Sequence, residues 1–151
     1  MDVISTVYRS IKALPSHNIY ELLSHYDIEV HYEPLLIAYG RESMILSSET
    51  GHTVIFLRPT VDKNYAELLL WHELAHYVLH YKPNMRMNYF LSTRWMEVEM
   101  QANLFATIAL MLNENISNRD PVEIAIRKGI PYQIALDSIG RIMMWANRIT
   151  T

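Results

Sequence analysis

Apolar residues at the start of the chain recur at intervals of three and four, the spacing that gathers them on one face of a helix. This pattern predicts a helix over residues 3–14, which Pro15 ends. A second, shorter helix is predicted over residues 19–26, because the polar residues 16–18 just before it supply candidate N-caps. The chain is therefore expected to open with two helices.

The next segment changes to the shorter period of β-strands. Residues 28–33 alternate apolar and polar side chains, which predicts a half-buried strand. Residues 52–58 are mostly β-branched or apolar and are the clearest strand candidate, bounded by Gly51 and Pro59. Residues 44–46 are a weaker candidate for another strand. A small sheet is therefore expected in the middle of the chain.

A long helical pattern follows, and it leaves little polar surface. It begins after Asp62, a candidate N-cap, and runs to about Tyr81, with Pro83 as the expected stop. Because apolar residues cover most of its circumference, this helix should be central and buried. Another helix is predicted over residues 93–112.

Two further helices are predicted near the C-terminal end. Pro121 suits the first turn of a short helix and Gly129 suits its C-terminal cap. A last helix is predicted over residues 131–148, with the side chains of residues 143–145 in the core.

The order of these elements predicts an α+β fold, with helices packed around a small β-sheet and a C-terminal helical hairpin. The polar segment 113–120 separates the last two helices from the rest. We therefore divide the chain into a core, residues 1–112, which holds the two long helices, and a C-terminal helical subdomain, residues 113–151, packed on that core.

Composition narrows the class of protein. The 151 residues suit one domain, and half of them are hydrophobic, which is enough for a sizeable core. The net charge of −3 gives no general attraction for nucleic acid or anionic membranes. The absence of cysteine excludes disulfides, thiolate metal sites and cysteine nucleophiles. No apolar run has the length of a signal peptide core or a membrane helix, so a cytoplasmic location is expected.

The long central helix carries His72-Glu73-Leu74-Ala75-His76, an HExxH motif. Residues four apart on a helix lie about 40° apart around its axis, so the two imidazoles can bind one cation. Glu73 lies about 100° around from His72, where its carboxylate can deprotonate a water molecule without binding the metal. In a chain with seven histidines, chance alone would give roughly 0.02 such motifs.

The alternative interpretation of the motif is three polar residues on a solvated face, with no metal. The apolar neighbours Trp71, Leu74 and Val78 argue against it, because they indicate burial. Burying three polar groups without partners would cost several kcal/mol, and a metal removes that cost.

A catalytic zinc site needs a third protein ligand. A metzincin would have a histidine six residues beyond His76, where this chain has Lys82, so that class is excluded. A gluzincin takes a glutamate from a later helix, and both Glu97 and Glu99 are in range. They point about 200° apart on a helix, so only one can face the metal. We choose Glu99, because it shares a stripe with small residues that suit close helix packing, and keep Glu97 as its rival.

Other polar residues near the motif are candidates for supporting roles. Asn103 lies one turn beyond Glu99 and could accept a hydrogen bond from the free N–H of a ligand histidine. His80 extends the stripe of the two motif histidines. It either contacts the metal site or the substrate, or forms hydrogen bonds at the helix end, which is the role that we favour. Ten tyrosines are available to stabilise an oxyanion, and three of them lie near the motif: Tyr65, Tyr77 and Tyr81.

The likeness to known proteins extends well beyond five residues. HELAHYVLH (72–80), followed by EMQANLFATIALM (99–111), resembles the ImmA/IrrE family of metallo-endopeptidases. The order of elements upstream, with an IEV strand and a TVIFL strand before the metal helix, is similar to that family as well. The resemblance covers most of residues 18–112.

The resemblance implies a zincin-like α+β peptidase with one catalytic Zn²⁺. Its ligands would be His72, His76 and Glu99, and Glu73 would be the catalytic base. Members of this family inactivate a helix-turn-helix repressor of a phage, mobile element or stress regulon, so a repressor of that kind is the expected protein partner.

This chain departs from the family pattern in two places. Its segment IALMLNEN (108–115) lacks the proline that commonly follows in the family. Longer members also carry an N-terminal DNA-binding domain, whereas this chain begins with the peptidase part. Its target would therefore be a separate protein.

Two alternative functions and two alternative metals remain open. The protein could bind and sequester a repressor without cleaving it, but a pure binder would not need Glu73. Residues 121–147 also resemble a helix-turn-helix and could bind DNA, yet the exposed positions hold few Arg or Lys. A helical hairpin beside the active site is the favoured interpretation. Mn²⁺ or Fe²⁺ could replace Zn²⁺ at a site of two histidines and one glutamate.

Overall fold

The computed structural model describes residues 2–81 and 95–150, and these residues form an α+β fold of seven helices and three strands. In chain order the elements are α1 (Val3–Lys12), α2 (Ile19–His25), β1 (Ile28–Tyr32), α3 (Leu35–Ala38), β2 (Ser43–Ser47), β3 (Thr53–Leu57), α4 (Lys63–His80), α5 (Trp95–Met111), α6 (Pro121–Arg127) and α7 (Tyr132–Thr150). The predicted fold class is confirmed. The expected stop at Pro83 and the expected helix start at residue 93 lie outside the described residues.

The three strands form one sheet in the order β1-β3-β2. β1 runs parallel to β3, and β2 runs antiparallel to it, so that Ile55 in the central strand lies between Val30 and Ile45. This order leaves β2 at one edge of the sheet. The weaker strand candidate, residues 44–46, is thus a full strand.

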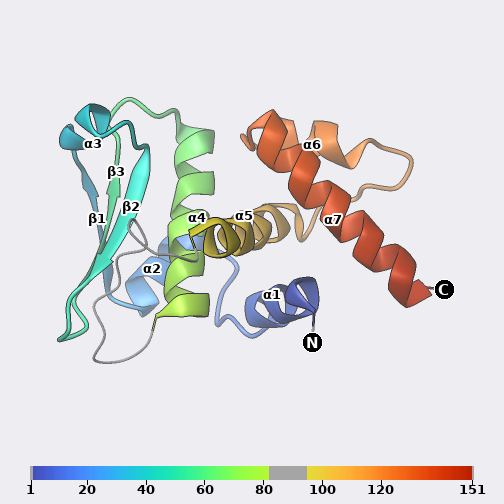
Figure 1. Cartoon of the computed structure of the whole chain (residues 1–151), viewed down its shortest axis with the longest axis horizontal. Helices are drawn as coiled ribbons and strands as arrows, with labels where there is room; N and C mark the ends of the chain where they lie inside the picture. Colours follow the sequence, from blue (N-terminus) through green and yellow to red (C-terminus); the bar gives the residue numbers. More distant parts are fainter. Residues whose placement is uncertain (1, 82–94, 151) are drawn as a thin grey trace.

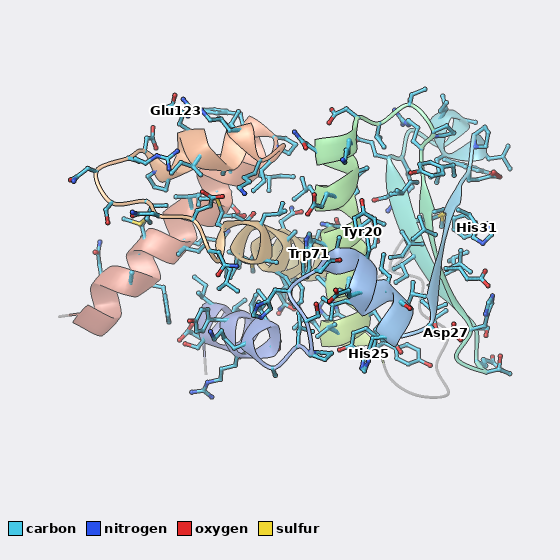
Figure 2. All side chains as sticks on the ribbon, turned by 180° about the vertical axis from the view of Figure 1, so that it is seen from behind. Tyr20, His25, Asp27, His31, Trp71 and Glu123 are labelled. Carbon is cyan, nitrogen blue, oxygen red and sulfur yellow. The ribbon has the colours of Figure 1, made fainter. Side chains whose placement is uncertain are left out.

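One face of the sheet packs on the helices and the other faces away from them. Ile45, Ile55 and Leu57 are buried in the core. His31 lies on the opposite face, away from α4 (Figure 2). Alternation along each strand therefore decides which side chains reach the protein interior.

Helix α4 occupies the middle of the molecule, between the sheet on one side and α5 to α7 on the other (Figure 1). Its N-cap is Asp62, as predicted, because the Asp62 carboxylate accepts a hydrogen bond from the Tyr65 N–H at 3.0 Å. The helix is buried over most of its middle turns, which confirms the prediction of a central helix. Among the described residues, no helix has the length and apolar character needed to cross a membrane.

Helix α5 crosses α4 closely because small residues lie where the two helices meet. Ala75 of α4 and Ala102 and Ala106 of α5 are all fully buried. The Trp71 and Phe105 rings, whose centroids lie 6.3 Å apart, fill the space beside them, and Trp71 lies near the centre of the molecule (Figure 2). This packing sets the position from which α5 presents polar side chains to α4.

The C-terminal hairpin of α6 and α7 packs beside the start of α4. Gly129, with φ +96°, follows the end of α6 as predicted, and it lies directly against Asn64 of α4. Ile130, Ala135 and Ile139 belong to the same hydrophobic cluster as the buried residues of α4. The division into a core of residues 1–112 and a subdomain of residues 113–151 stays a prediction.

The structure corrects the predicted core at residues 143–145 and adds a short helix that the pattern did not predict. Met143 and Met144 are not core residues, because they are 45% and 60% exposed. Trp145 is half-buried, with its indole N–H donating to the Ser5 hydroxyl at 3.1 Å. The short helix α3 was not predicted, because its four residues are too few to show a helical period.

Candidate metal centre

The three polar residues of the HExxH motif lie together on α4. His72, Glu73 and His76 each offer a nitrogen or oxygen atom, and these atoms lie within 4.8 Å of one another. His76 and Glu73 are buried, at 2% and 4% exposure, and the His72 side chain is 12% exposed. Because the residues are one or four apart on a single helix, their convergence follows from the sequence spacing alone.

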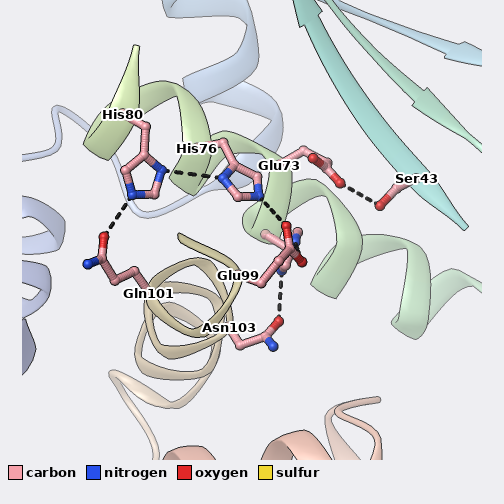
Figure 3. A network of polar contacts seen from close by, with 8 residues as sticks. Ser43, Glu73, His76, His80, Glu99, Gln101 and Asn103 are labelled. Atoms are coloured by element: carbon pink, nitrogen blue, oxygen red, sulfur yellow. Dashed lines mark hydrogen bonds and ion pairs between the residues drawn. The ribbon is translucent and has the colours of Figure 1, made fainter. Parts of the chain in front are cut away.

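Helix α5 brings Glu99 to the two imidazoles. One Glu99 carboxylate oxygen, Oε2, lies 3.0 Å from His72 Nε2, and the other, Oε1, lies 2.9 Å from His76 Nε2. Figure 3 shows the carboxylate between α4 and α5. Glu97 is exposed. The structure therefore brings Glu99 to the motif, and it leaves Glu97 on the outer side of α5.

These donor atoms fit a divalent metal ion. At a zinc–ligand distance of about 2.0–2.1 Å and tetrahedral angles, neighbouring ligand atoms lie about 3.3 Å apart. The observed separations of 2.9 Å and 3.0 Å between imidazole and carboxylate atoms need only a few tenths of an ångström of opening. Two imidazole nitrogens and one carboxylate are also a donor set that zinc prefers.

The second nitrogen of His72 is held by Asn103, as predicted. His72 Nδ1 lies 2.8 Å from Asn103 Oδ1, and because an amide oxygen only accepts, Nδ1 carries the proton. In the neutral ring Nε2 then carries the lone pair that a metal requires. A lone pair facing the Glu99 carboxylate is unfavourable, so the close approach requires a positive charge between them, either a second proton on His72 or a metal ion.

The electrostatics of the site favour a negative carboxylate beside positive charge. Without a metal, burial opposes ionisation of Glu99, but hydrogen bonds from the Nε2–H groups of protonated His72 and His76 outweigh it and hold the Glu99 pKa far below its usual range. Burial also lowers the pKa of His72, but the Glu99 hydrogen bond and the charge of Glu73 outweigh it, so the His72 pKa is raised. The negative charges of Glu73 and Glu99, which raise the His72 pKa, would also stabilise a cation bound between these groups.

Ser43 holds the carboxylate of Glu73. The Ser43 hydroxyl on β2 donates a hydrogen bond of 2.7 Å to Glu73 Oε2, and both residues are buried. In Figure 3 this contact lies on the sheet side of α4, whereas Glu99 lies on the α5 side. The role of Ser43 was not predicted, because the sequence does not indicate which strand position lies against the helix.

His80 is the last residue of α4, and it contacts the Nδ1 atom of His76, the ring nitrogen that does not face Glu99. Its Nδ1 is 3.3 Å from His76 Nδ1, and its Nε2 is 2.7 Å from Oε1 of Gln101 on α5 (Figure 3). These contacts agree with the favoured prediction that His80 forms hydrogen bonds near the helix end. Gln101 was not among the predicted residues.

A cavity of about 280 Å³ opens beside the cluster. Its lining comes from four parts of the chain. These are residues 40–43, which end at the first residue of β2, five residues of α4 that include Tyr65, two residues of α5, and Ile134 of α7. The C-terminal hairpin thus contributes to the wall of the site. A cavity with Glu73 and Glu99 in its wall can accept part of a substrate beside the reactive groups.

Of the three tyrosines near the motif, Tyr65 lines this cavity. Burial, together with a hydrogen bond to Glu42, raises the pKa of its hydroxyl group. The Tyr65 hydroxyl thus keeps its one proton, which it donates to Glu42 here and would have to turn towards a substrate to donate there. Tyr77 and Tyr81 stack on each other, with ring centroids 5.0 Å apart, and neither lines the cavity.

Comparison with known protein families identifies a match over the middle of the chain. The family model Peptidase_M78, described as the IrrE N-terminal-like domain, matches residues 23–124. The matched segment includes the sheet, α4 and α5, and therefore every residue of the polar cluster. No curated protein and no solved structure matches the chain.

Proposed function

This chain belongs to the Peptidase_M78 family of the IrrE N-terminal-like domain, and from that membership we propose that it is a zinc-dependent endopeptidase. We place the metal at His72, His76 and Glu99, and assign Glu73 as the catalytic base. The observation that carries this proposal is the convergence of both Nε2 atoms on one carboxylate, 2.9 Å and 3.0 Å away, next to a buried glutamate.

Bound at these ligands, zinc would lower the pKa of a water molecule and polarise the carbonyl of the scissile peptide bond. Mn²⁺ and Fe²⁺ accept the same ligands, and zinc is the choice by ligand type. The remaining chemistry belongs to residues of the chain.

Glu73 would accept a proton from the attacking water and transfer it to the leaving amine. The hydrogen bond from Ser43 to Glu73 Oε2 supports this role, because it limits the carboxylate to one orientation and leaves Oε1 as the basic atom. Tyr65, a protonated phenol in the cavity wall, is our candidate for a hydrogen bond to the substrate oxyanion.

A protein substrate follows from the peptidase family. We propose a more specific one, a helix-turn-helix repressor cleaved in the cytoplasm, on the strength of the likeness of residues 72–80 and 99–111 to the ImmA/IrrE family. The second candidate function is sequestration of such a repressor without cleavage. DNA binding through residues 121–147 is disfavoured, because the cations of this segment are paired with carboxylates: Arg127 with Glu123, Lys128 with Glu114 and Arg141 with Asp137.

Glu73→Gln separates cleavage from sequestration. The purified protein, loaded with zinc, is incubated with each helix-turn-helix repressor encoded beside its gene, and fragments are identified by mass spectrometry. We expect Glu73→Gln to retain zinc and to lower the cleavage rate at least 100-fold, because it removes the base but none of the ligands. His76→Ala should lose zinc and cleavage together. Cleavage at the wild-type rate by Glu73→Gln would contradict the proposed mechanism, and inactivation of the repressor without fragments would favour sequestration.

A further inference from the structure

Three close polar contacts connect α5 to α4 and return to α5. Gln101 Oε1 lies 2.7 Å from His80 Nε2, and His80 Nδ1 lies 3.3 Å from His76 Nδ1. His76 Nε2 in turn lies 2.9 Å from Glu99 Oε1. Figure 3 shows the whole series, with Gln101 and Glu99 on opposite flanks of α5.

The chemistry of the groups gives this series a direction. An amide oxygen has no proton to donate, so the His80 nitrogen that faces Gln101 must carry one. In a neutral imidazole the other nitrogen, Nδ1, then has a lone pair and accepts the proton of His76 Nδ1. His76 is left with its lone pair on Nε2, the atom that faces Glu99.

The two imidazoles are therefore oriented in the same way by two amides of α5. Asn103 acts on His72 through one hydrogen bond. Gln101 lies about 160° around α5 from Glu99, and in the structure it meets His80 instead of His76. His80 supplies the ring that spans the remaining distance to His76.

We propose that Gln101 and His80 are positioning residues that hold His76 in the tautomer and ring orientation needed to bind the metal. This inference rests on the proposed function, because it assumes that His76 Nε2 is a metal ligand. It assigns a role to two residues for which the motif itself gives no indication. The competing interpretation is that Gln101 and His80 only join the ends of α4 and α5, which would affect stability and leave metal affinity unchanged.

A pair of substitutions at Gln101 tests the proposal. Gln101→Met has a similar length and helix propensity but no acceptor for His80. Gln101→Glu keeps an acceptor oxygen at nearly the same place. Zinc affinity is measured for each by competition with a chromophoric chelator, and the stability of the metal-free proteins is measured by thermal unfolding.

We expect Gln101→Met to weaken zinc binding about 10- to 100-fold, the usual effect of removing the partner of a ligand histidine. Gln101→Glu should stay within about threefold of the wild-type affinity, because it restores the acceptor. A merely structural contact would lower the unfolding temperature of Gln101→Met with no change in affinity, and that result would overturn the proposal.

A second measurement needs no variant. In the zinc-loaded wild-type protein, long-range ¹H–¹⁵N correlation spectra report which ring nitrogen of each histidine carries the proton. The proposal requires the Nε2–H form of His80 and the Nδ1–H form of His76. The opposite tautomer of His80 would refute it even if Gln101→Met failed to fold.

The outcomes also separate the inference from the proposed function. If the wild-type protein does not bind zinc, the metal centre is wrong, and the inference fails with it. If the wild-type protein binds zinc and Gln101→Met binds it equally well, only the inference fails.

Discussion

Gly129 is the point at which the C-terminal hairpin lies against the first turn of the helix that carries the HExxH motif. Its φ of +96° is a backbone conformation that side chains disfavour. A Cβ atom added there would lie 2.8 Å from Asn64 Cβ and 2.9 Å from the Asn64 carbonyl carbon. Because the carbonyl carbon belongs to the backbone of α4, the contact is relieved only if the helix or the turn moves.

Gly129→Ala should therefore lower the free energy of unfolding through two separate effects. The disfavoured backbone conformation costs about 1–3 kcal/mol. The forced contact with Asn64 adds about 1–3 kcal/mol, as in other overpacked cores. The expected total is about 2–6 kcal/mol, a large part of the stability of an ordinary domain.

Gly40 provides a matched control within the same chain. Its φ is +65°, yet no atom lies within 4 Å of a Cβ added there. Gly40→Ala should therefore cost only the backbone strain, about 1–2 kcal/mol. Gly140, inside α7 and with open space around it, should give the opposite sign, because alanine in a helix is about 0.5–1 kcal/mol more favourable.

Urea unfolding followed by far-ultraviolet circular dichroism measures all three variants. The expected order of stability is Gly140→Ala, wild type, Gly40→Ala and then Gly129→Ala. If Gly129→Ala lay within about 0.5 kcal/mol of Gly40→Ala, the contact with Asn64 would contribute nothing. The close packing of the hairpin against α4 would then be refuted.

Two other substitutions test the site and the core. Ser43→Ala removes the donor to Glu73, so we expect kcat for a cleaved substrate to fall roughly 10- to 100-fold while the zinc content stays at the wild-type level; an unchanged kcat would show that the hydroxyl does not orient the base. Leu74→Ala, at a fully buried position of α4, should lower the free energy of unfolding by about 2–5 kcal/mol in urea; a loss below 1 kcal/mol would contradict the tight packing around the motif.

Features that depend on spacing within one element were predictable from the sequence. The convergence of His72 and His76 follows from helix geometry, and so does the position of Asn103 on the same face of α5 as Glu99. The long helix and the strand at residues 53–57 were predicted because their apolar periods are clear over several residues. Their predicted limits differ from the structure by only one or two residues at the described ends.

Features that depend on contacts between distant elements were not predictable. Ser43 reaches Glu73 only because β2 is the edge strand beside α4, and the pattern of residues 43–47 does not reveal strand order. Gln101 points away from Glu99, so helix spacing alone offered no reason to include it. Met143 and Met144 were wrongly predicted as core residues for the same reason. An apolar helix face predicts packing but does not show where the neighbouring elements end.

The separate origins of the polar contacts have a consequence for engineering. Helices α4 and α5 provide the imidazoles, the two carboxylates and both amides, whereas Ser43 comes from the sheet. Metal selectivity and proton-transfer efficiency should therefore be adjustable by independent sets of substitutions, one in the helix pair and one along β2. The same pair of helices, lifted from this chain, offers a two-segment template for installing such a centre in a designed helical scaffold.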